Sequence, residues 1–105
     1  MLIVLDYDET YTAAPVLWDI FITHAKEHGH DIVCCTMRLE TDTAYNDDVI
    51  TDMGIHDIKI VYAAAERDKW EAMQKAGYHP ENAIWIDDRP MFVYMDRPIN
   101  EWMEL

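Results

Sequence analysis

Hydrophobic residues along the chain alternate between short uninterrupted runs and longer segments in which they recur every three or four positions. Uninterrupted runs are typical of strands buried on both faces, and the wider spacing is typical of amphipathic helices. The runs predict strands at residues 2–5, 32–36, 58–62 and 83–86. The spaced segments predict helices at residues 15–28, 43–53 and 66–76.

Proline and glycine mark the ends of the predicted helices. Pro15 stands at the first position of the first helix and Gly29 follows its last turn. Gly54 is expected to close the second helix, and Gly77 the third. The predicted order is therefore β-α-β-α-β-α-β, and residues 91–105 are expected to add a short helix and an edge segment.

Alternation of strands and helices predicts an α/β fold. We expect a three-layer, Rossmann-like parallel sheet with helices on both faces, because right-handed crossovers place successive helices there. With 105 residues, the chain is expected to form a single domain over residues 1–105. A domain this small gains from tight packing, a bound ion or a partner subunit, so a homo-oligomer is a further expectation.

The charge balance restricts the classes of partner. The chain carries 21 acidic and 8 basic residues, a formal net charge of −13, which opposes binding to nucleic acid and to anionic membranes. The first apolar run is too short for a signal peptide or a membrane span, which predicts a cytoplasmic protein. Cys34 and Cys35 are neighbours in a predicted buried strand, and this favours reduced thiols.

Polar side chains follow three of the predicted strands. Asp6 and Asp8 come after the first strand, and their side chains can project to the same side. Two such carboxylates repel each other unless a cation or a shared proton lies between them. Thr36 ends the second strand, and Asp87 and Asp88 follow the fourth. Because parallel strands end at one edge, we expect these residues to meet in one crevice.

Three basic residues are expected near the same edge. Lys69 lies at the start of the third predicted helix, Arg38 two residues after Thr36, and Arg89 directly after the aspartate pair. Each guanidinium could clamp a substrate phosphate, and each could equally form an exposed ion pair with a nearby acid.

The order of these residues resembles the four motifs of the haloacid dehalogenase-like superfamily. The segments that carry the resemblance are DYDET with Thr12, then VCCT, then Lys69, then IWIDD, which together span residues 2 to 89. The resemblance implies that Asp6 is a nucleophile that forms an aspartyl-phosphate. It implies that Asp8 is the general acid and base, and that Thr36 and Lys69 hold the transferred phosphoryl group.

The resemblance also implies Mg²⁺ as the cofactor, a hard cation that prefers oxygen ligands. The ligands would be the Asp6 carboxylate, the Asp8 backbone carbonyl, and Asp87 with help from Asp88. Thr10 and Thr12 would support the loop after the nucleophile. Glu9 departs from the pattern, because members of the superfamily often have glycine there and Glu disfavours a positive φ.

These observations predict a capless, magnesium-dependent phosphohydrolase with an open site. Its expected substrate is a small phosphorylated molecule, by preference a nucleotide or a nucleotide-derived phosphomonoester. Two alternatives stay open: a protein that sequesters a nucleotide without turnover, and a phosphatase of polynucleotide ends, which the Asp-Asp-Arg sequence favours and the acidic charge opposes. A phosphoacceptor receiver domain does not fit, because the third strand ends without an aspartate.

Overall fold

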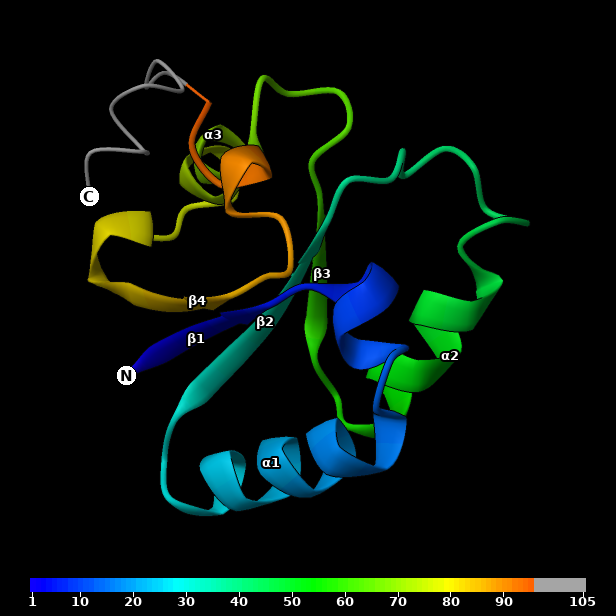
Figure 1. The fold of residues 1–105 in the computed structure, drawn as a ribbon, viewed down its shortest axis with the longest axis vertical. Coiled ribbons are helices and arrows are strands. Elements are labelled where there is room, and N and C mark those ends of the chain that lie inside the picture. The colour runs from blue at the N-terminus through cyan, green and yellow to red at the C-terminus, as the bar shows by residue number, and fades with distance from the viewer. Residues whose placement is uncertain (96–105) are drawn as a thin grey trace.

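In the computed structural model, which describes residues 1–95, four parallel strands form one sheet and helices pack against it (Figure 1). The strands are β1 (Leu2–Leu5), β2 (Asp31–Thr36), β3 (Lys59–Tyr62) and β4 (Ala83–Ile86). The helices are α1 (Pro15–Glu27), α2 (Asp47–Ile55) and α3 (Lys69–Lys75), and short helical turns cover Tyr7–Tyr11, Pro80–Asn82 and Pro90–Phe92. The predicted α/β fold with a parallel sheet is confirmed.

The strand order β3-β2-β1-β4 places β1 inside the sheet. Val4 of β1 lies opposite Val33 of β2 on one side and Trp85 of β4 on the other. The Asp6 N–H then donates a hydrogen bond to the Ile86 carbonyl at 2.9 Å. Asp6 therefore emerges at the middle of the carboxyl edge, beside the residues that follow β4.

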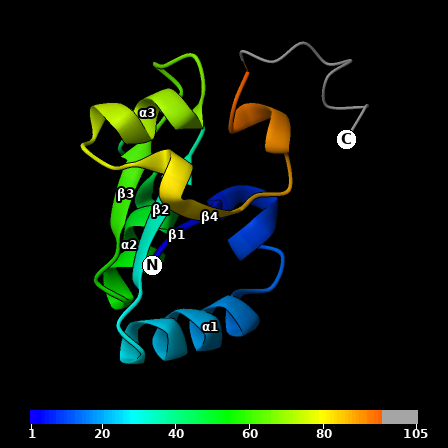
Figure 2. The ribbon, with the colours of Figure 1, turned by 90° about the vertical axis from the view of Figure 1, so that its left-hand side faces the viewer.

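Alternate side chains of β1 enter two separate buried clusters. Ile3 and Leu5 pack in one cluster with Ile22 of α1 and with Met53 of α2. Val4 belongs to the other cluster, which includes Met73 of α3. In Figure 2 the strands lie between α1 and α3. Burying apolar area in this way stabilises a fold by about 25 cal/mol per Å², and here it also anchors α3, which carries Lys69.

The second helix differs from its prediction at both ends. It begins at Asp47, because Asn46 donates a side-chain hydrogen bond to the Leu39 carbonyl at 2.7 Å and fixes the preceding segment as a turn. It also continues past Gly54. Asp57 takes the left-handed conformation after the helix, with φ of 55°, and aspartate tolerates this backbone geometry better than most residues.

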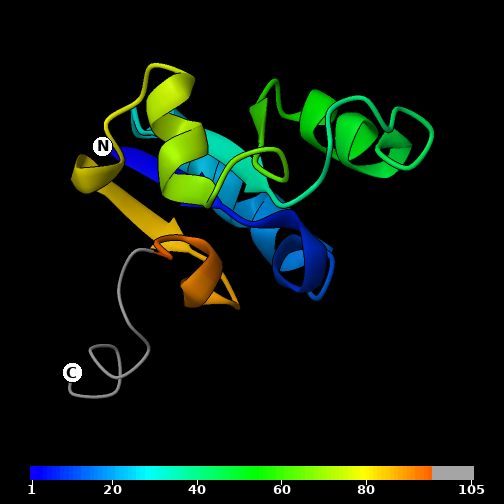
Figure 3. The ribbon, with the colours of Figure 1, turned by 90° about the horizontal axis from the view of Figure 1, so that it is seen from above.

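The third helix begins at Lys69, three residues later than predicted, because Asp68 caps it. The buried Asp68 carboxylate accepts a hydrogen bond from the Glu71 N–H at 2.8 Å and one from the Met95 N–H at 2.9 Å. The segment after β4 returns to this end of α3, where the Trp70 N–H donates to the Val93 carbonyl at 2.8 Å (Figure 3). One carboxylate thus fixes both the helix start and the returning chain.

The remaining expectations about the chain have mixed outcomes. The short helix expected after residue 91 corresponds to Pro90–Phe92, and the expected edge segment falls in residues 96–105, outside the described residues.

Cys34 and Cys35 are free and buried, and burial raises the pKa of the Cys35 thiol to about 12. Within residues 1–95, no helix combines the length and apolar character that crossing a membrane requires.

Candidate functional site

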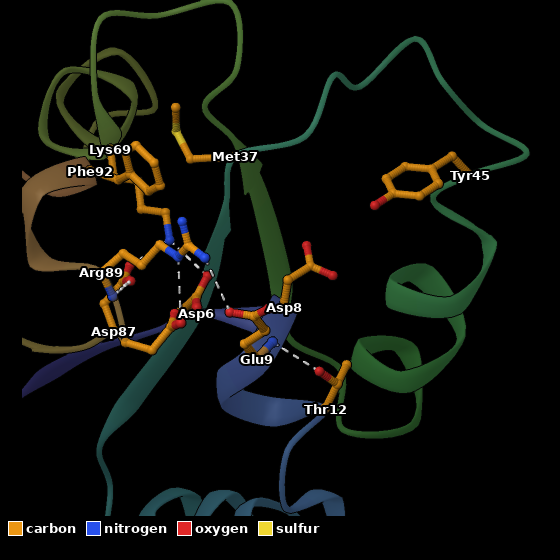
Figure 4. Close-up of a pocket in the computed structure, with 11 residues that line it drawn as sticks. Asp6, Asp8, Glu9, Thr12, Met37, Tyr45, Lys69, Asp87, Arg89 and Phe92 are labelled. Atoms are coloured by element: carbon orange, nitrogen blue, oxygen red, sulfur yellow. Dashed lines mark hydrogen bonds and ion pairs between the residues drawn. The ribbon is translucent and has the colours of Figure 1, made fainter.

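A cavity of about 400 Å³ opens at the carboxyl edge of the sheet (Figure 4). Six of the residues predicted from the sequence line it: Asp6, Asp8, Lys69, Asp87, Asp88 and Arg89. Five acidic side chains, Glu9 included, face two basic ones across this space. The loops after β1 and β4 and the start of α3 supply these residues, so they converge as predicted, whereas Thr36 at the end of β2 is not among the lining residues.

Lys69 lies between two of the carboxylates. Its Nζ donates to Asp6 Oδ1 at 2.7 Å and to Asp87 Oδ2 at 2.5 Å, and its side chain is 2% exposed. Burial acts to lower the pKa of Lys69, but the hydrogen bonds to Asp6 and Asp87 outweigh it and raise the pKa above its ordinary value. Lys69 is therefore a fixed positive charge in the cavity.

Asp6 and Asp88 affect each other's protonation. Burial and an interaction with Asp88 raise the pKa of Asp6 to about 6, against the lowering effect of Lys69. The same interaction with Asp6 holds the pKa of Asp88 below its ordinary value. The Thr10 hydroxyl donates to Asp6 Oδ2 at 2.8 Å. The nearby carboxylates thus favour a proton or a cation between them.

The acidic group offers the kind of oxygen donors that a magnesium ion takes. Oxygen atoms of Asp6, Asp87 and Asp88 all lie within 4.8 Å of one another, and carboxylate oxygens are the ligands that Mg²⁺ prefers. Burial, with a smaller effect from Asp88 and Asp87, raises the pKa of Asp6, so its negative charge is unfavourable here and a divalent cation would stabilise it. The contact expected from the Asp8 backbone carbonyl stays a prediction.

Arg38 does not line the cavity, although it was predicted to bind substrate. It is 5% exposed, and the five N–H groups of its guanidinium donate to the carboxylates of Asp8 and Asp48 and to the Tyr45 carbonyl. The guanidinium also lies over the rings of Tyr7 and Tyr45, at 5.1 Å and 4.2 Å from their centroids. No N–H group is left for a substrate phosphate, and the ion pair is buried on the arginine side.

Thr36 ends β2 behind the cavity. Its side chain is fully buried, and its Oγ1 has no hydrogen-bond partner among residues 1–95. Buried hydroxyl groups in native proteins almost always have a partner, so this one marks a position where a further acceptor or donor would be favourable. The expected hydrogen bond from Thr36 to a phosphoryl oxygen stays a prediction.

The turn after Asp6 contains a strained residue. Glu9 adopts φ of 63° and ψ of 2°, the left-handed conformation for which glycine is the usual choice. Its N–H donates to the Thr12 hydroxyl at 2.9 Å, and this bond holds the turn closed. Glu9 was expected to disfavour a positive φ, and the backbone nevertheless adopts one at this position.

Arg89 lies at the rim of the cavity. Its side chain is 58% exposed, and its guanidinium is 3.5 Å from the Glu9 carboxylate and 3.8 Å from that of Asp88. It also lies 6.0 Å from the centroid of the Phe92 ring. These exposed contacts leave Arg89 accessible to a ligand.

Sequence reasoning missed the apolar rim of the cavity. Met37 and Phe92 border it near Lys69, and the Tyr45 ring borders it on the far side (Figure 4). None of the three belongs to a chemical motif, and Tyr45 reaches the rim through an irregular loop. The second partner of Arg38, Asp48, was missed as well. The only feature of the sequence that could have indicated it is the aspartate pair Asp47-Asp48 at the start of α2.

Comparison with known proteins adds no assignment. No family model matches the chain, and no curated protein or solved structure matches it significantly. The functional argument therefore depends on the residues of the cavity.

Proposed function

We propose that this protein is a magnesium-dependent phosphohydrolase that acts on phosphomonoesters through an aspartyl-phosphate intermediate. It would be a small, capless member of the haloacid dehalogenase-like type, a three-layer α/β protein with helices on both faces of its sheet. The observation that carries the proposal is the position of Asp6. It lies at the centre of the carboxyl edge, between Lys69 and the aspartates that follow β4.

Asp6 meets the requirements of a nucleophile. Its two carboxylate oxygens are fixed by Lys69 and Thr10, and it lines the cavity. In the proposed first step an Asp6 oxygen bonds to phosphorus while the bond from phosphorus to the leaving oxygen breaks, and Asp8 protonates that oxygen. In the second step a water oxygen bonds to phosphorus and gives a proton to Asp8, while the bond from phosphorus to the Asp6 oxygen breaks. Inorganic phosphate leaves, and both carboxyl groups return to their starting states.

The charge of the cavity makes a cation necessary for this chemistry. Five acidic side chains against two basic ones would repel a phosphate dianion. Asp6, Asp87 and Asp88 would hold Mg²⁺ together with the Asp8 carbonyl. When bound, the ion supplies positive charge that offsets the repulsion between the carboxylates and the phosphate. Lys69 adds a second positive charge, and the Thr36 hydroxyl supplies an unpaired hydrogen-bonding group.

The rim of the cavity favours a substrate larger than the phosphate itself. Tyr45 is 58% exposed, and Phe92 and Arg89 lie at the rim as well. Aromatic rings and a guanidinium are suited to stacking on a planar base, so we propose a nucleotide-type substrate. A cytoplasmic location and association into a homo-oligomer remain predictions from the sequence.

A phosphatase screen tests the proposal. Nucleotides, sugar phosphates and phosphorylated oligonucleotides would be incubated with the wild type and with Asp6→Asn, in the presence of Mg²⁺ and in excess EDTA. The wild type should release phosphate from at least one compound, and Asp6→Asn should do so at least about a hundredfold more slowly. Lys75→Met, which removes the ion pairs of an exposed lysine with Glu66 and Glu71 away from the cavity, is the control for loss of a charge. Equal rates for wild type and Asp6→Asn would reject the role of Asp6.

A second candidate function is sequestration of a nucleotide without turnover. One observation favours it: Tyr45, Phe92 and Arg89 line the cavity and could bind a nucleotide base without taking part in any bond breaking. Incubation of the protein with a nucleotide monophosphate, followed by denaturation and chromatography, separates the two candidates. Intact nucleotide recovered in full indicates sequestration, and a nucleoside with free phosphate indicates catalysis.

A further inference from the structure

We propose that Arg38 is the positioning residue for Asp8: the buried guanidinium holds the Asp8 carboxylate at the wall of the cavity, where it exchanges a proton with the substrate oxygen. The inference rests on the proposed function, because it assigns Arg38 a role in a phosphohydrolase. It also replaces the phosphate clamp predicted from the sequence.

The contact between the two side chains is bidentate. Arg38 Nε donates to Asp8 Oδ2 at 2.9 Å, and Arg38 Nη2 donates to Asp8 Oδ1 at 2.7 Å. Paired parallel bonds of this kind fix the plane of a carboxylate as well as its position. Each carboxylate oxygen has two lone pairs, so the bonds from Arg38 leave a site on each oxygen for a transferred proton.

Arg38 is itself immobilised from several directions. Asp48, in the first turn of α2, accepts from Nη1 at 2.7 Å, and the Tyr45 carbonyl accepts from the same nitrogen at 3.0 Å. The rings of Tyr7 and Tyr45 lie against the guanidinium. Its hydrogen bonds to Asp8 and Asp48 raise the pKa of Arg38 above its ordinary value, so it keeps its charge.

The two partners differ in exposure. The Arg38 side chain is 4% exposed, whereas that of Asp8 is 47% exposed and borders the cavity. A rigid buried group therefore fixes the position and orientation of an accessible carboxylate at the cavity. A carboxyl group transfers a proton efficiently only when it is held within hydrogen-bond reach of the reacting oxygen.

The identity of the leaving group makes this role measurable. An alkoxide leaving oxygen needs a proton as its bond to phosphorus breaks, whereas 4-nitrophenolate is stable enough to leave without one. Loss of a correctly placed acid must therefore slow the hydrolysis of alkyl phosphates more than that of 4-nitrophenyl phosphate. A general loss of folded protein slows both equally.

The experiment compares kcat for 4-nitrophenyl phosphate with kcat for the alkyl phosphomonoester that the wild type hydrolyses best, with Mg²⁺ present. Arg38→Met should reduce the alkyl rate at least about tenfold more than the aryl rate, and Asp8→Asn should change the ratio in the same direction. In an Asp8→Asn background, Arg38→Met should add no further selective loss, because the two residues act together.

Two more variants test whether a loss of stability alone could change the rate ratio. Met53→Ala opens a space in the core beside α2 and removes none of the hydrogen bonds of Arg38, and it should lower Tm with an unchanged rate ratio. Arg38→Lys should retain most of the selective loss, because one ammonium cannot form the paired bonds. It also provides the comparison if Arg38→Met does not fold.

The outcomes separate the inference from the function that it presupposes. An active wild type with an unchanged rate ratio in the Arg38 variants overturns the positioning role and leaves the phosphohydrolase intact. Release of no phosphate from any substrate by the wild type overturns both. The assignment is supported if Arg38→Met selectively slows alkyl phosphate hydrolysis in the wild type but adds no further selective loss in the Asp8→Asn background.

Discussion

Glu9 illustrates how the site constrains single residues. The chain must turn sharply after Asp6 so that Asp6 and Asp8 both border the cavity, and this turn places Glu9 in the left-handed region. For residues with a Cβ atom that conformation costs about 1–2 kcal/mol. The side chain recovers little of this, because its ion pair with Arg89 is exposed on both sides.

Replacing Glu9 by glycine should therefore relieve strain. Glu9→Ala is the matched comparison, since it also removes the ion pair but keeps a Cβ atom. We expect Glu9→Gly to have a free energy of unfolding higher than that of Glu9→Ala by about 1 kcal/mol, measured by urea denaturation. Equal stability of the two variants would show that the turn is not strained.

Residue positions were predictable where a strand end fixes them. Asp6, Lys69 and Asp87 converge because β1 and β4 are adjacent and α3 begins at the same edge, and each lies directly at the end or start of an element. The partners of Arg38 were not predictable in the same way. Asp48 meets Arg38 only through the path of the loop before α2, which no periodic pattern specifies.

At the scale of elements, α1 is joined to α2 by a small polar cluster. Asp19 of α1 accepts a hydrogen bond from the Tyr11 hydroxyl at 2.6 Å and lies 2.7 Å from Nε2 of His56, at the end of α2. Burial acts to raise the pKa of Asp19, but the hydrogen bonds with Tyr11 and His56 outweigh it and hold the pKa below its ordinary value. The folded state therefore favours the Asp19 carboxylate.

This cluster predicts a pH dependence with a definite sign. A carboxyl group whose pKa is lower in the folded state than in the unfolded state contributes stability above its unfolded pKa of 3.8, and the contribution is lost as pH falls further. The wild type should therefore be more stable than Asp19→Asn at pH 6, and the difference should shrink below pH 4. Urea unfolding at several pH values measures it; a difference that is constant down to pH 3 would contradict the assignment.

The elements themselves were predicted with uneven success. The strands are found close to their predicted positions, because uninterrupted apolar runs flanked by polar residues have few alternative interpretations. Helix ends depend on single residues next to them, which the spacing of apolar positions does not specify. Asp68 delays the start of α3, and Asp57 rather than Gly54 supplies the left-handed residue after α2.

For the molecule as a whole, the net charge of −13 is reflected in the cavity, which is lined by more acidic than basic side chains. Acidic groups are crowded at the carboxyl edge, where Asp6, Asp87 and Asp88 come together. Any added salt screens this repulsion to some extent, so general screening must be separated from the binding of one ion. Binding of one ion saturates and depends on particular carboxylates, whereas general screening does neither.

Magnesium should therefore stabilise the fold as a specific ligand. A ligand that binds only the folded state adds about 2.7 kcal/mol when its concentration is a hundred times its Kd, and Tm should rise and then level off as Mg²⁺ is added. NaCl at matched ionic strength is the control for screening. Asp88→Asn should lose most of the Mg²⁺-dependent rise, because it removes an accessible carboxylate of the group, whereas Asp47→Asn, an exposed acid in the first turn of α2, should keep it. If NaCl gives the same rise as MgCl₂ in all three proteins, the acidic group responds to screening alone and is not a metal site.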